Sequence, residues 1–161
     1  MKKVEIHTDG ACRGNPGPGG YGVVMVSGKH RLELSQGYRR TTNNRMELLA
    51  GVVALESLKS PCRVKFVSDS LYVINAMKKG WLRGWKARGW LTASKQAVKN
   101  EELWKRLDAA AAPHQVEWAW IRGHAGHQEN ERCDELAVAA AQSSGLLVDT
   151  GFEQPEEDRL L

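Results

Sequence analysis

Ile6-His7-Thr8-Asp9-Gly10 is the stretch from which we interpret the fold and the function of this chain. Val4, Ile6 and Thr8 alternate with Glu5, His7 and Asp9, which is the pattern of a half-buried strand. The pattern predicts a strand that ends at Asp9, followed by a glycine-rich turn. Further along the chain, acidic residues lie near other predicted strand ends and helix starts, and we expect three of them to gather around Asp9: Glu47, Asp69 and Asp134.

Length and composition indicate one ordinary globular domain. The chain has 161 residues, enough to bury a core. It contains no apolar run near the roughly 18 residues that a membrane span requires. A strand-like pattern begins at Val4, in place of the apolar stretch of a secretory leader. Its three cysteines are odd in number and lack C-x-x-C spacing, which indicates reduced thiols. We therefore expect a cytoplasmic protein with no membrane partner.

Charge is distributed unevenly along the chain. The segment from Lys78 to Arg106 has nine basic and two acidic residues, a net charge of +7, although the whole chain carries only +4. The run from Asp149 to the C-terminus has five acidic residues and one basic residue, a net charge of −4. Such a division indicates a basic surface for a polyanion and an acidic tail.

Hydrophobic periodicity predicts an α/β domain over residues 1–145 and a mobile acidic tail over residues 146–161. A G-x-G-x-x-G match at Gly17, Gly19 and Gly22 precedes a strand where a dinucleotide site requires a helix, so it indicates a turn. After the first strand, the predicted elements are strands 21–26, 32–38, 64–68 and 116–121 and helices 43–58, 70–79, 100–111 and 128–141. They suggest a mixed sheet flanked by helices.

Each of the four carboxylates also has a local explanation. Asp9 and Asp69 lie at predicted strand ends, where Asp often caps a turn or helix. Glu47 follows Asn44 by three residues, which is the spacing of a capping box. Asp134 lies near two other acidic residues and is compatible with a solvated helix face. The residues four and seven positions after it are apolar, however, so we expect this face to be partly buried.

A shared metal site explains the four carboxylates together. Asp9 and Asp69 follow strands that we expect to be parallel, and the carboxyl ends of parallel strands meet at one edge of a sheet. Carboxylates brought together repel one another unless a cation lies between them. All-oxygen ligation suits Mg²⁺ or Mn²⁺ rather than Zn²⁺, and a pair of such ions suits in-line phosphoryl displacement. The sequence therefore predicts two Mg²⁺ ions, for which Mn²⁺ can substitute.

Five motifs resemble those of bacterial ribonuclease HI, of the type 1 ribonuclease H family. They are Thr8-Asp9-Gly10-Ala11-Cys12, Gly14-Asn15-Pro16-Gly17, Thr41-Thr42-Asn43-Asn44-Arg45-Met46-Glu47, Ser68-Asp69-Ser70, and Gly123-His124-Ala125-Gly126-His127 with Glu129-Asn130-Glu131-Arg132-Cys133-Asp134. The resemblance extends from Lys3 to about Gly151, in the family's order and spacing. It implies a ribonuclease H-like fold, a five-stranded mixed sheet with helices on both faces. It also implies that the catalytic, metal-binding residues are Asp9, Glu47, Asp69 and Asp134.

His124 lies in a polar, glycine-rich loop, where a histidine is usually only a surface residue. The resemblance implies that His124 is a mobile catalytic residue that assists proton transfer to or from the attacking water or the leaving group. A zinc site formed by His124, His127 and Cys133 is an alternative interpretation, although it offers a single thiol and loose spacing.

The basic, tryptophan-containing segment from Gly80 to Trp90 is predicted to bind substrate. Cations at this density contact phosphates, and an exposed tryptophan stacks on a sugar or a base. A short amphipathic helix that buries its tryptophans is the structural alternative. The resemblance implies a basic protrusion that holds the DNA strand of an RNA–DNA hybrid, and we assign to it Trp81, Trp85, Lys86, Arg88 and Trp90.

A second substrate-binding region is predicted at the start of helix 43–58, where backbone N–H groups and the helix dipole attract phosphate. Simple capping is compatible with the same residues. The resemblance implies a DNA-phosphate pocket with Thr42 and Arg45, and minor-groove contacts from Asn15, Asn43 and Asn44. Because the 2′-hydroxyl distinguishes RNA from DNA, we expect that discrimination near Cys12, Asn15 and Glu47.

The resemblance implies an endonuclease that hydrolyses the RNA strand of RNA–DNA hybrids with two metal ions, leaving 5′-phosphate and 3′-hydroxyl ends. We expect a monomer without an obligate protein partner. A non-catalytic hybrid-binding module on the same fold is a second hypothesis, although such a module would not need all four carboxylates. A DNA-acting relative such as a transposase or integrase core is a third, which the basic tryptophan segment and the short chain disfavour.

Overall fold

The computed structural model describes residues 1–153, which contain a five-stranded mixed sheet. β1 (Lys2–Cys12), β2 (Gly17–Ser27) and β3 (His30–Thr41) form an antiparallel meander. β4 (Cys62–Ser68) pairs with β1 in parallel, and β5 (Gln115–Trp120) pairs with β4 in parallel, so the strand order is β3-β2-β1-β4-β5. The predicted five-stranded mixed sheet is confirmed.

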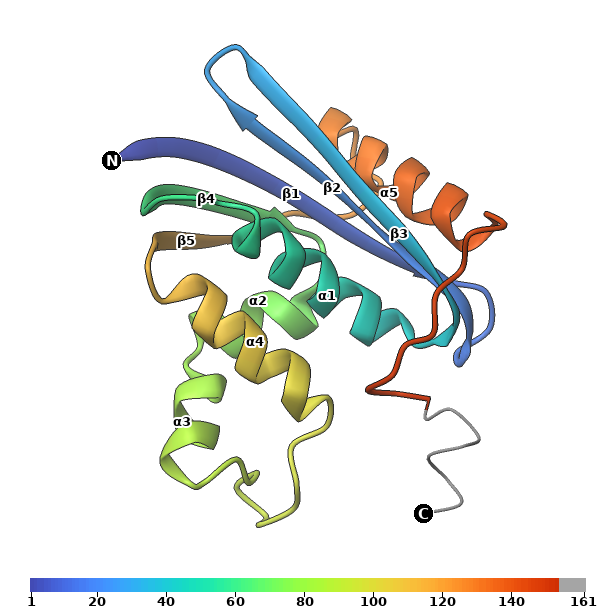
Figure 1. The fold of residues 1–161 in the computed structure, drawn as a ribbon. Coiled ribbons are helices and arrows are strands. Elements are labelled where there is room, and N and C mark those ends of the chain that lie inside the picture. The colour runs from blue at the N-terminus through green and yellow to red at the C-terminus, as the bar shows by residue number, and fades with distance from the viewer. Residues whose placement is uncertain (154–161) are drawn as a thin grey trace.

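Helices cover both faces of this sheet (Figure 1). α1 (Asn43–Glu56), α2 (Leu71–Lys78), α3 (Trp81–Ala87) and α4 (Glu101–Ala111) lie on one side. α5 (Gln128–Ala141) packs on the other side, against β1, β2 and β3. Within residues 1–153, no helix combines the length and the apolar character that a membrane span requires.

The main core lies between α1 and the sheet. β1 directs Val4 and Ile6 toward α1, and β4 directs Val64 and Phe66 to the same side, so alternation along each strand produces one buried face. α1 is buried over most of its length, as expected for a helix that is apolar around most of its circumference. This burial holds the acidic residue of its second turn away from bulk water.

β1 does not end at Asp9, as the sequence predicted, but continues to Cys12. It continues because its antiparallel pairing with β2 extends to Cys12 and Gly19. Its parallel pairing with β4 is shorter and ends where Thr8 faces Ser68. Asp9 therefore lies where β1 leaves β4, and the predicted glycine-rich turn contracts to residues 13–16.

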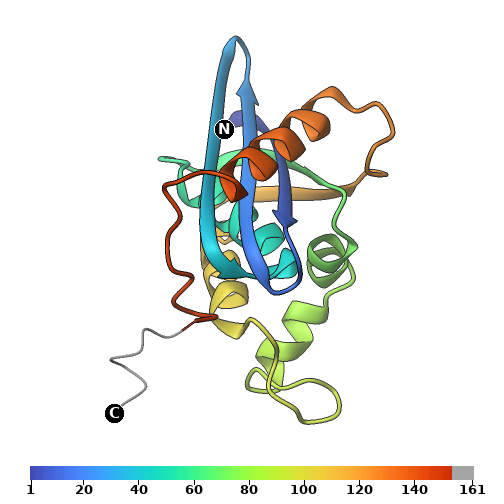
Figure 2. The same ribbon diagram turned by 90° about the vertical axis from the view of Figure 1, so that its right-hand side faces the viewer.

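The chain after α5 packs against the edge of the sheet as far as Glu153, so contacts with the sheet continue past the expected boundary at residue 145 (Figure 2). Leu147 exchanges backbone hydrogen bonds with β3, donating to Gly37 and accepting from Arg39. The buried Asp149 accepts a 2.7 Å hydrogen bond from Thr41. These polar contacts hold a segment whose low apolar content suggested a mobile tail; the remainder of that prediction, residues 154–161, lies outside the described residues.

Candidate active site

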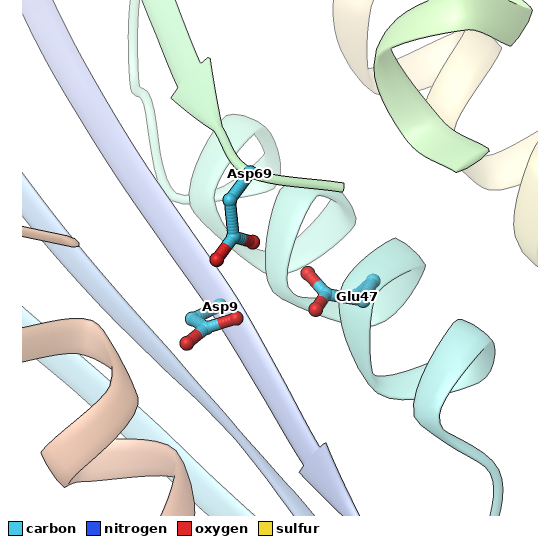
Figure 3. A group of neighbouring side chains, drawn as sticks. All are labelled: Asp9, Glu47 and Asp69. Atoms are coloured by element: carbon cyan, nitrogen blue, oxygen red, sulfur yellow. The ribbon is translucent and has the colours of Figure 1, made fainter. Parts of the chain in front are cut away.

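Asp9 of β1, Glu47 of α1 and Asp69, directly after β4, direct their carboxylates toward one another (Figure 3). One oxygen atom of each lies within 4.8 Å of the others. In the described part of the chain, this is the one group of three or more acidic, histidine or cysteine residues close enough to hold a metal ion. The structure thus brings together three of the four carboxylates predicted to form the site.

Register and a close backbone approach create this cluster. The parallel pairing between β1 and β4 ends where Thr8 faces Ser68. Asp9 and Asp69 are the next residues after these two, so they lie side by side at the same level of the sheet. Gly10 allows α1 to approach β1, because a Cβ atom at this position would lie 2.7 Å from the Glu47 backbone nitrogen. Without that approach, Glu47 could not reach the two aspartates.

The capping explanations of Glu47 and Asp69 are wrong. The N-cap of α1 is Thr42, whose hydroxyl accepts a hydrogen bond from the Arg45 N–H at 3.3 Å. The N-cap of α2 is Ser70, whose hydroxyl accepts from the Val73 N–H at 3.3 Å. The helix starts are therefore satisfied by hydroxyls, and both carboxylates remain available for another role.

Burial and mutual repulsion disfavour negative charge in this cluster. Burial, followed by the charge of Asp69, raises the pKa of Asp9 to about 7. Burial raises the pKa of Glu47 well above its ordinary value, and the charges of Asp9 and Asp69 raise it further. Glu47 Oε2 is buried without a hydrogen-bond partner among residues 1–153. A divalent cation would satisfy that oxygen and remove the repulsion, so the residues fit the predicted metal.

Asp134, the fourth predicted carboxylate, lies half-buried on α5 and is not a member of the 4.8 Å group. It is still close enough for its charge to raise the pKa of Asp9, as the smallest contribution. Asp134 therefore flanks the cluster from the opposite face of the sheet.

His124 is exposed in the loop between β5 and α5, with a positive φ of 55°. The alternative zinc site is not formed among the described residues. Its thiol, that of Cys133, is buried and donates to the His7 carbonyl at 3.2 Å. His124 is thus left as a solvent-facing group in a loop that begins beside Asp69.

Several residues predicted to bind substrate meet at the start of α1. Asn15 Oδ1 accepts a 3.0 Å hydrogen bond from the Asn43 N–H. The Cys12 thiol donates to the Thr41 carbonyl at 3.4 Å. Asn44 is exposed in the first turn of α1. The loop after β1 and the N-terminus of α1 therefore form one surface, a single helical turn from Glu47.

Arg45 is buried, with its guanidinium bonded entirely inside the protein. Its Nε and Nη2 donate to Asp149 at 2.8 and 2.9 Å, and its Nη1 and Nη2 donate to Glu102 at 2.9 and 2.7 Å. Nη1 also donates to Asn100 Oδ1 at 3.2 Å. These bonds use all five N–H groups of the side chain. To contact a DNA phosphate, as predicted, Arg45 would have to exchange at least one of these bonds, and its role in substrate binding stays a prediction.

α3 combines an exposed surface with core packing. Trp81 is 45% exposed, and Lys79 Nζ lies 5.8 Å from its ring centroid. Trp85 instead packs edge-on against Trp104, with ring centroids 5.3 Å apart. The buried-tryptophan explanation therefore applies to Trp85, whereas Trp81 is exposed and its role in substrate binding stays a prediction.

The other residues assigned to the basic segment also have internal partners. Lys86 forms a 2.8 Å ion pair with Asp108. Arg88 Nε donates to the Leu91 carbonyl at 3.2 Å. Trp90 is half-buried, with Lys105 Nζ 5.3 Å from its ring centroid. The amphipathic-helix explanation therefore accounts for part of this segment.

Two features of the site had no signal in the sequence that we used. Asp149, a partner of Arg45, was assigned to the tail because the segment after Gly145 has little apolar content. Trp120, the last residue of β5, and Gly123, three residues later, contact Asp69, which lies 51 or more residues earlier in the chain. The one hint in the sequence was Trp120, near the end of a predicted strand, because an indole N–H can donate a hydrogen bond.

A five-stranded mixed sheet with a carboxylate cluster where β1 and β4 separate defines the ribonuclease H-like class of α/β proteins. Residues 1–142 match the RNase H family. The chain is 57% identical to Ribonuclease H of Aeromonas hydrophila subsp. hydrophila over 95% of this chain and 99% of that protein. The chain belongs to the RNase H family, and it is an endonuclease that hydrolyses the RNA strand of RNA–DNA hybrids.

Solved structures agree with this assignment. LC9-RNase H1, a type 1 RNase H with the type 2 active-site motif, is 35% identical, with a TM-score of 0.80 over 99% of this chain and 84% of that one. LC11-RNase H1, solved in complex with RNA/DNA hybrid, is 25% identical, with a TM-score of 0.64 over 86% of this chain and 96% of that one. The family and fold predicted from the five motifs are confirmed.

Proposed function

We propose that Asp9, Glu47, Asp69 and Asp134 hold two Mg²⁺ ions, for which Mn²⁺ can substitute, and that hydrolysis leaves 5′-phosphate and 3′-hydroxyl ends. The observation that carries this proposal is the buried cluster of three carboxylates within 4.8 Å. Bound divalent cations activate the attacking water and stabilise the leaving oxygen. Asp134 joins the three from α5, on the side from which its charge already acts on Asp9.

The protein's own groups have distinct tasks in this proposal. Asp9 lies within reach of both Glu47 and Asp69, so it would hold metal together with each of them. Glu47 supplies the buried, unpartnered oxygen Oε2. His124 faces solvent on its loop, where it moves a proton to or from the reacting oxygen atoms of the substrate.

The hybrid is bound by the two surfaces beside the carboxylates. Thr42, Asn43 and Asn44, with Cys12 and Asn15, bind the minor groove and a DNA phosphate at the start of α1, where backbone N–H groups favour anions. The exposed part of α3 and its flanks, with Trp81 foremost, bind the DNA strand. The complex of LC11-RNase H1 with RNA/DNA hybrid supports this substrate. The enzyme works as a cytoplasmic monomer, consistent with three free cysteines.

Cleavage of a labelled RNA–DNA hybrid tests the assignment of the carboxylates. Asp9→Asn should abolish Mg²⁺-dependent cleavage while hybrid binding survives, because the amide cannot replace an anionic ligand. Glu117→Gln is the matched control, since it makes the same change on the exposed part of β5. Full activity of Asp9→Asn, or cleavage in EDTA, would overturn the proposal. If the unmodified protein does not cut the hybrid at any protein concentration, the result would favour the binding-module hypothesis. If it cuts duplex DNA as well as it cuts the hybrid, the result would favour the transposase-like hypothesis.

A further inference from the structure

The end of β5 holds the peptide that carries Asp69. The indole Nε1 of Trp120 donates a hydrogen bond to the Asp69 backbone carbonyl at 3.0 Å. The next N–H along the chain, that of Ile121, donates to the Ser68 carbonyl at 3.0 Å. Two successive carbonyl groups at the end of β4 are therefore bonded to two successive residues of β5 and its extension. This arrangement restricts the backbone of Asp69 just where the chain leaves the sheet.

Gly123 approaches the carboxylate of Asp69 itself. A Cβ atom at Gly123 would lie 2.6 Å from Asp69 Oδ2 and 3.4 Å from Asp69 Cγ. The backbone of Gly123 is not in the left-handed region, so glycine is required here for space and not for conformation. A methyl group at this position would displace the carboxylate from its direction toward Asp9 and Glu47.

Asp69 needs such support more than its two neighbours do. Asp9 and Glu47 are 6% and 5% exposed and are held by burial, whereas Asp69 is only half-buried. Its carboxylate makes no hydrogen bond within residues 1–153, so packing alone directs it. Trp120 is 45% exposed and is not one of the side chains that pack against the core, and its indole N–H is bonded to Asp69.

We propose that Trp120 and Gly123 are positioning residues, which aim the Asp69 carboxylate at the metal ions. This inference rests on the proposed role of Asp69 as a metal ligand. Groups that orient a ligand affect metal affinity although they do not touch the metal. Because Gly123 directly precedes His124, the same contact also fixes where the histidine loop begins relative to the carboxylates.

Mn²⁺ binding to the metal-free protein, followed by electron paramagnetic resonance, tests the inference without relying on activity. Gly123→Ala should raise the dissociation constant for Mn²⁺ about tenfold. Trp120→Phe, which keeps an aromatic ring but removes the N–H donor, should raise it several-fold. The Mg²⁺ concentration for half-maximal cleavage should rise by the same factors, and excess Mg²⁺ should restore most of the activity. Melting temperatures in EDTA should match that of the unmodified protein.

Two controls separate positioning from general damage. Gly145→Ala adds a methyl group in open space, and Trp118→Phe changes a tryptophan of the same strand whose indole N–H has no hydrogen-bond partner within residues 1–153. Unchanged Mn²⁺ affinity in Gly123→Ala and Trp120→Phe would overturn the inference. Weaker Mn²⁺ binding together with a clearly lower melting temperature in EDTA would also overturn it, because the substitution would then have damaged the fold. Full activity of Asp69→Asn would instead overturn the proposed function.

Discussion

Asp9 shows how one side chain can favour catalysis at the expense of stability. Burial and the neighbouring charge of Asp69 raise its folded pKa from 3.8 to about 7. The native state therefore binds a proton more tightly than the unfolded chain does. Without metal, the contribution of Asp9 to the free energy of unfolding is complete below about pH 4 and is lost as the pH rises through about 7. A bound cation would relieve this cost, because it binds the charged form.

Asp9→Asn should therefore stabilise the metal-free protein at pH 8, by at least about 1 kcal/mol, while it abolishes cleavage. The amide cannot ionise, so the variant escapes the penalty that the carboxylate incurs at high pH. Urea denaturation in EDTA at pH 4.5 and pH 8 measures the effect, and the advantage should shrink at the lower pH. Adding Mg²⁺ should stabilise only the unmodified protein. A variant less stable than the unmodified protein at pH 8 in EDTA would contradict this account.

α3 is the element in which binding and packing are most closely combined. Trp81 and Trp85 are separated by one helical turn, yet Trp81 faces solvent while Trp85 packs against Trp104. Stacking of an exposed aromatic ring on a nucleotide contributes roughly 1–3 kcal/mol to binding, whereas removal of a packed aromatic side chain reduces stability by about 3 kcal/mol. The same substitution should therefore have different consequences at the two positions.

Trp81→Ala should weaken hybrid binding about tenfold with little change in melting temperature. Trp85→Ala should mainly lower the melting temperature. Fluorescence anisotropy with a labelled hybrid at two salt concentrations, together with thermal unfolding of both variants, measures this contrast. The turnover number at saturating hybrid should change little for Trp81→Ala, because the carboxylates are untouched. Equal effects of the two substitutions on affinity would show that α3 does not present Trp81 to the substrate.

At the scale of the whole molecule, the ion pair of Arg45 and Asp149 joins α1 to the chain after α5. Burial by itself would raise the pKa of Asp149, but the hydrogen bonds that Asp149 accepts from Arg45 and Thr41 outweigh that effect. They lower its pKa below the ordinary value of 3.8. The stabilisation by this pair is therefore complete above about pH 4 and is lost as the pH falls below it. Since Arg45 is buried, loss of the Asp149 charge would leave it with the exposed Glu102 as its remaining acidic partner within residues 1–153.

Asp149→Asn should lower the free energy of unfolding at pH 7 by about 3 kcal/mol, and this difference should narrow as the pH falls below about 4. Glu153→Gln is the control, because its partner Arg39 is 54% exposed and an exposed ion pair contributes little. Denaturation by urea at pH 7 and pH 3 measures both. A similar loss in the two variants would show that the tail segment contributes through general contacts and not through the buried pair.

The sequence was sufficient to predict the five strands, four of the five helices in residues 1–153 and the three clustered carboxylates, for local reasons. Alternation along β1 and the apolar circumference of α1 are periodic signals that a short window contains. The predicted bounds of α5, residues 128–141, agree with the structure. The end of β1 was misplaced because strand length depends on the partner: antiparallel pairing with β2 continues after parallel pairing with β4 stops.

By itself, the sequence determined the fold class, the family and the acidic residues from which the site is built, because these depend on periodicity and on motifs of a few residues. Only the tertiary structure decided which basic and aromatic groups are free to act. Arg45 and Trp85 are residue types that bind nucleic acids, and in this structure both also contact residues distant in the chain. Trp120 and Gly123 acquire a role only because β5 is placed beside β4. Hydrogen bonds and close contacts between distant segments depend on three-dimensional packing, and no local pattern encodes them.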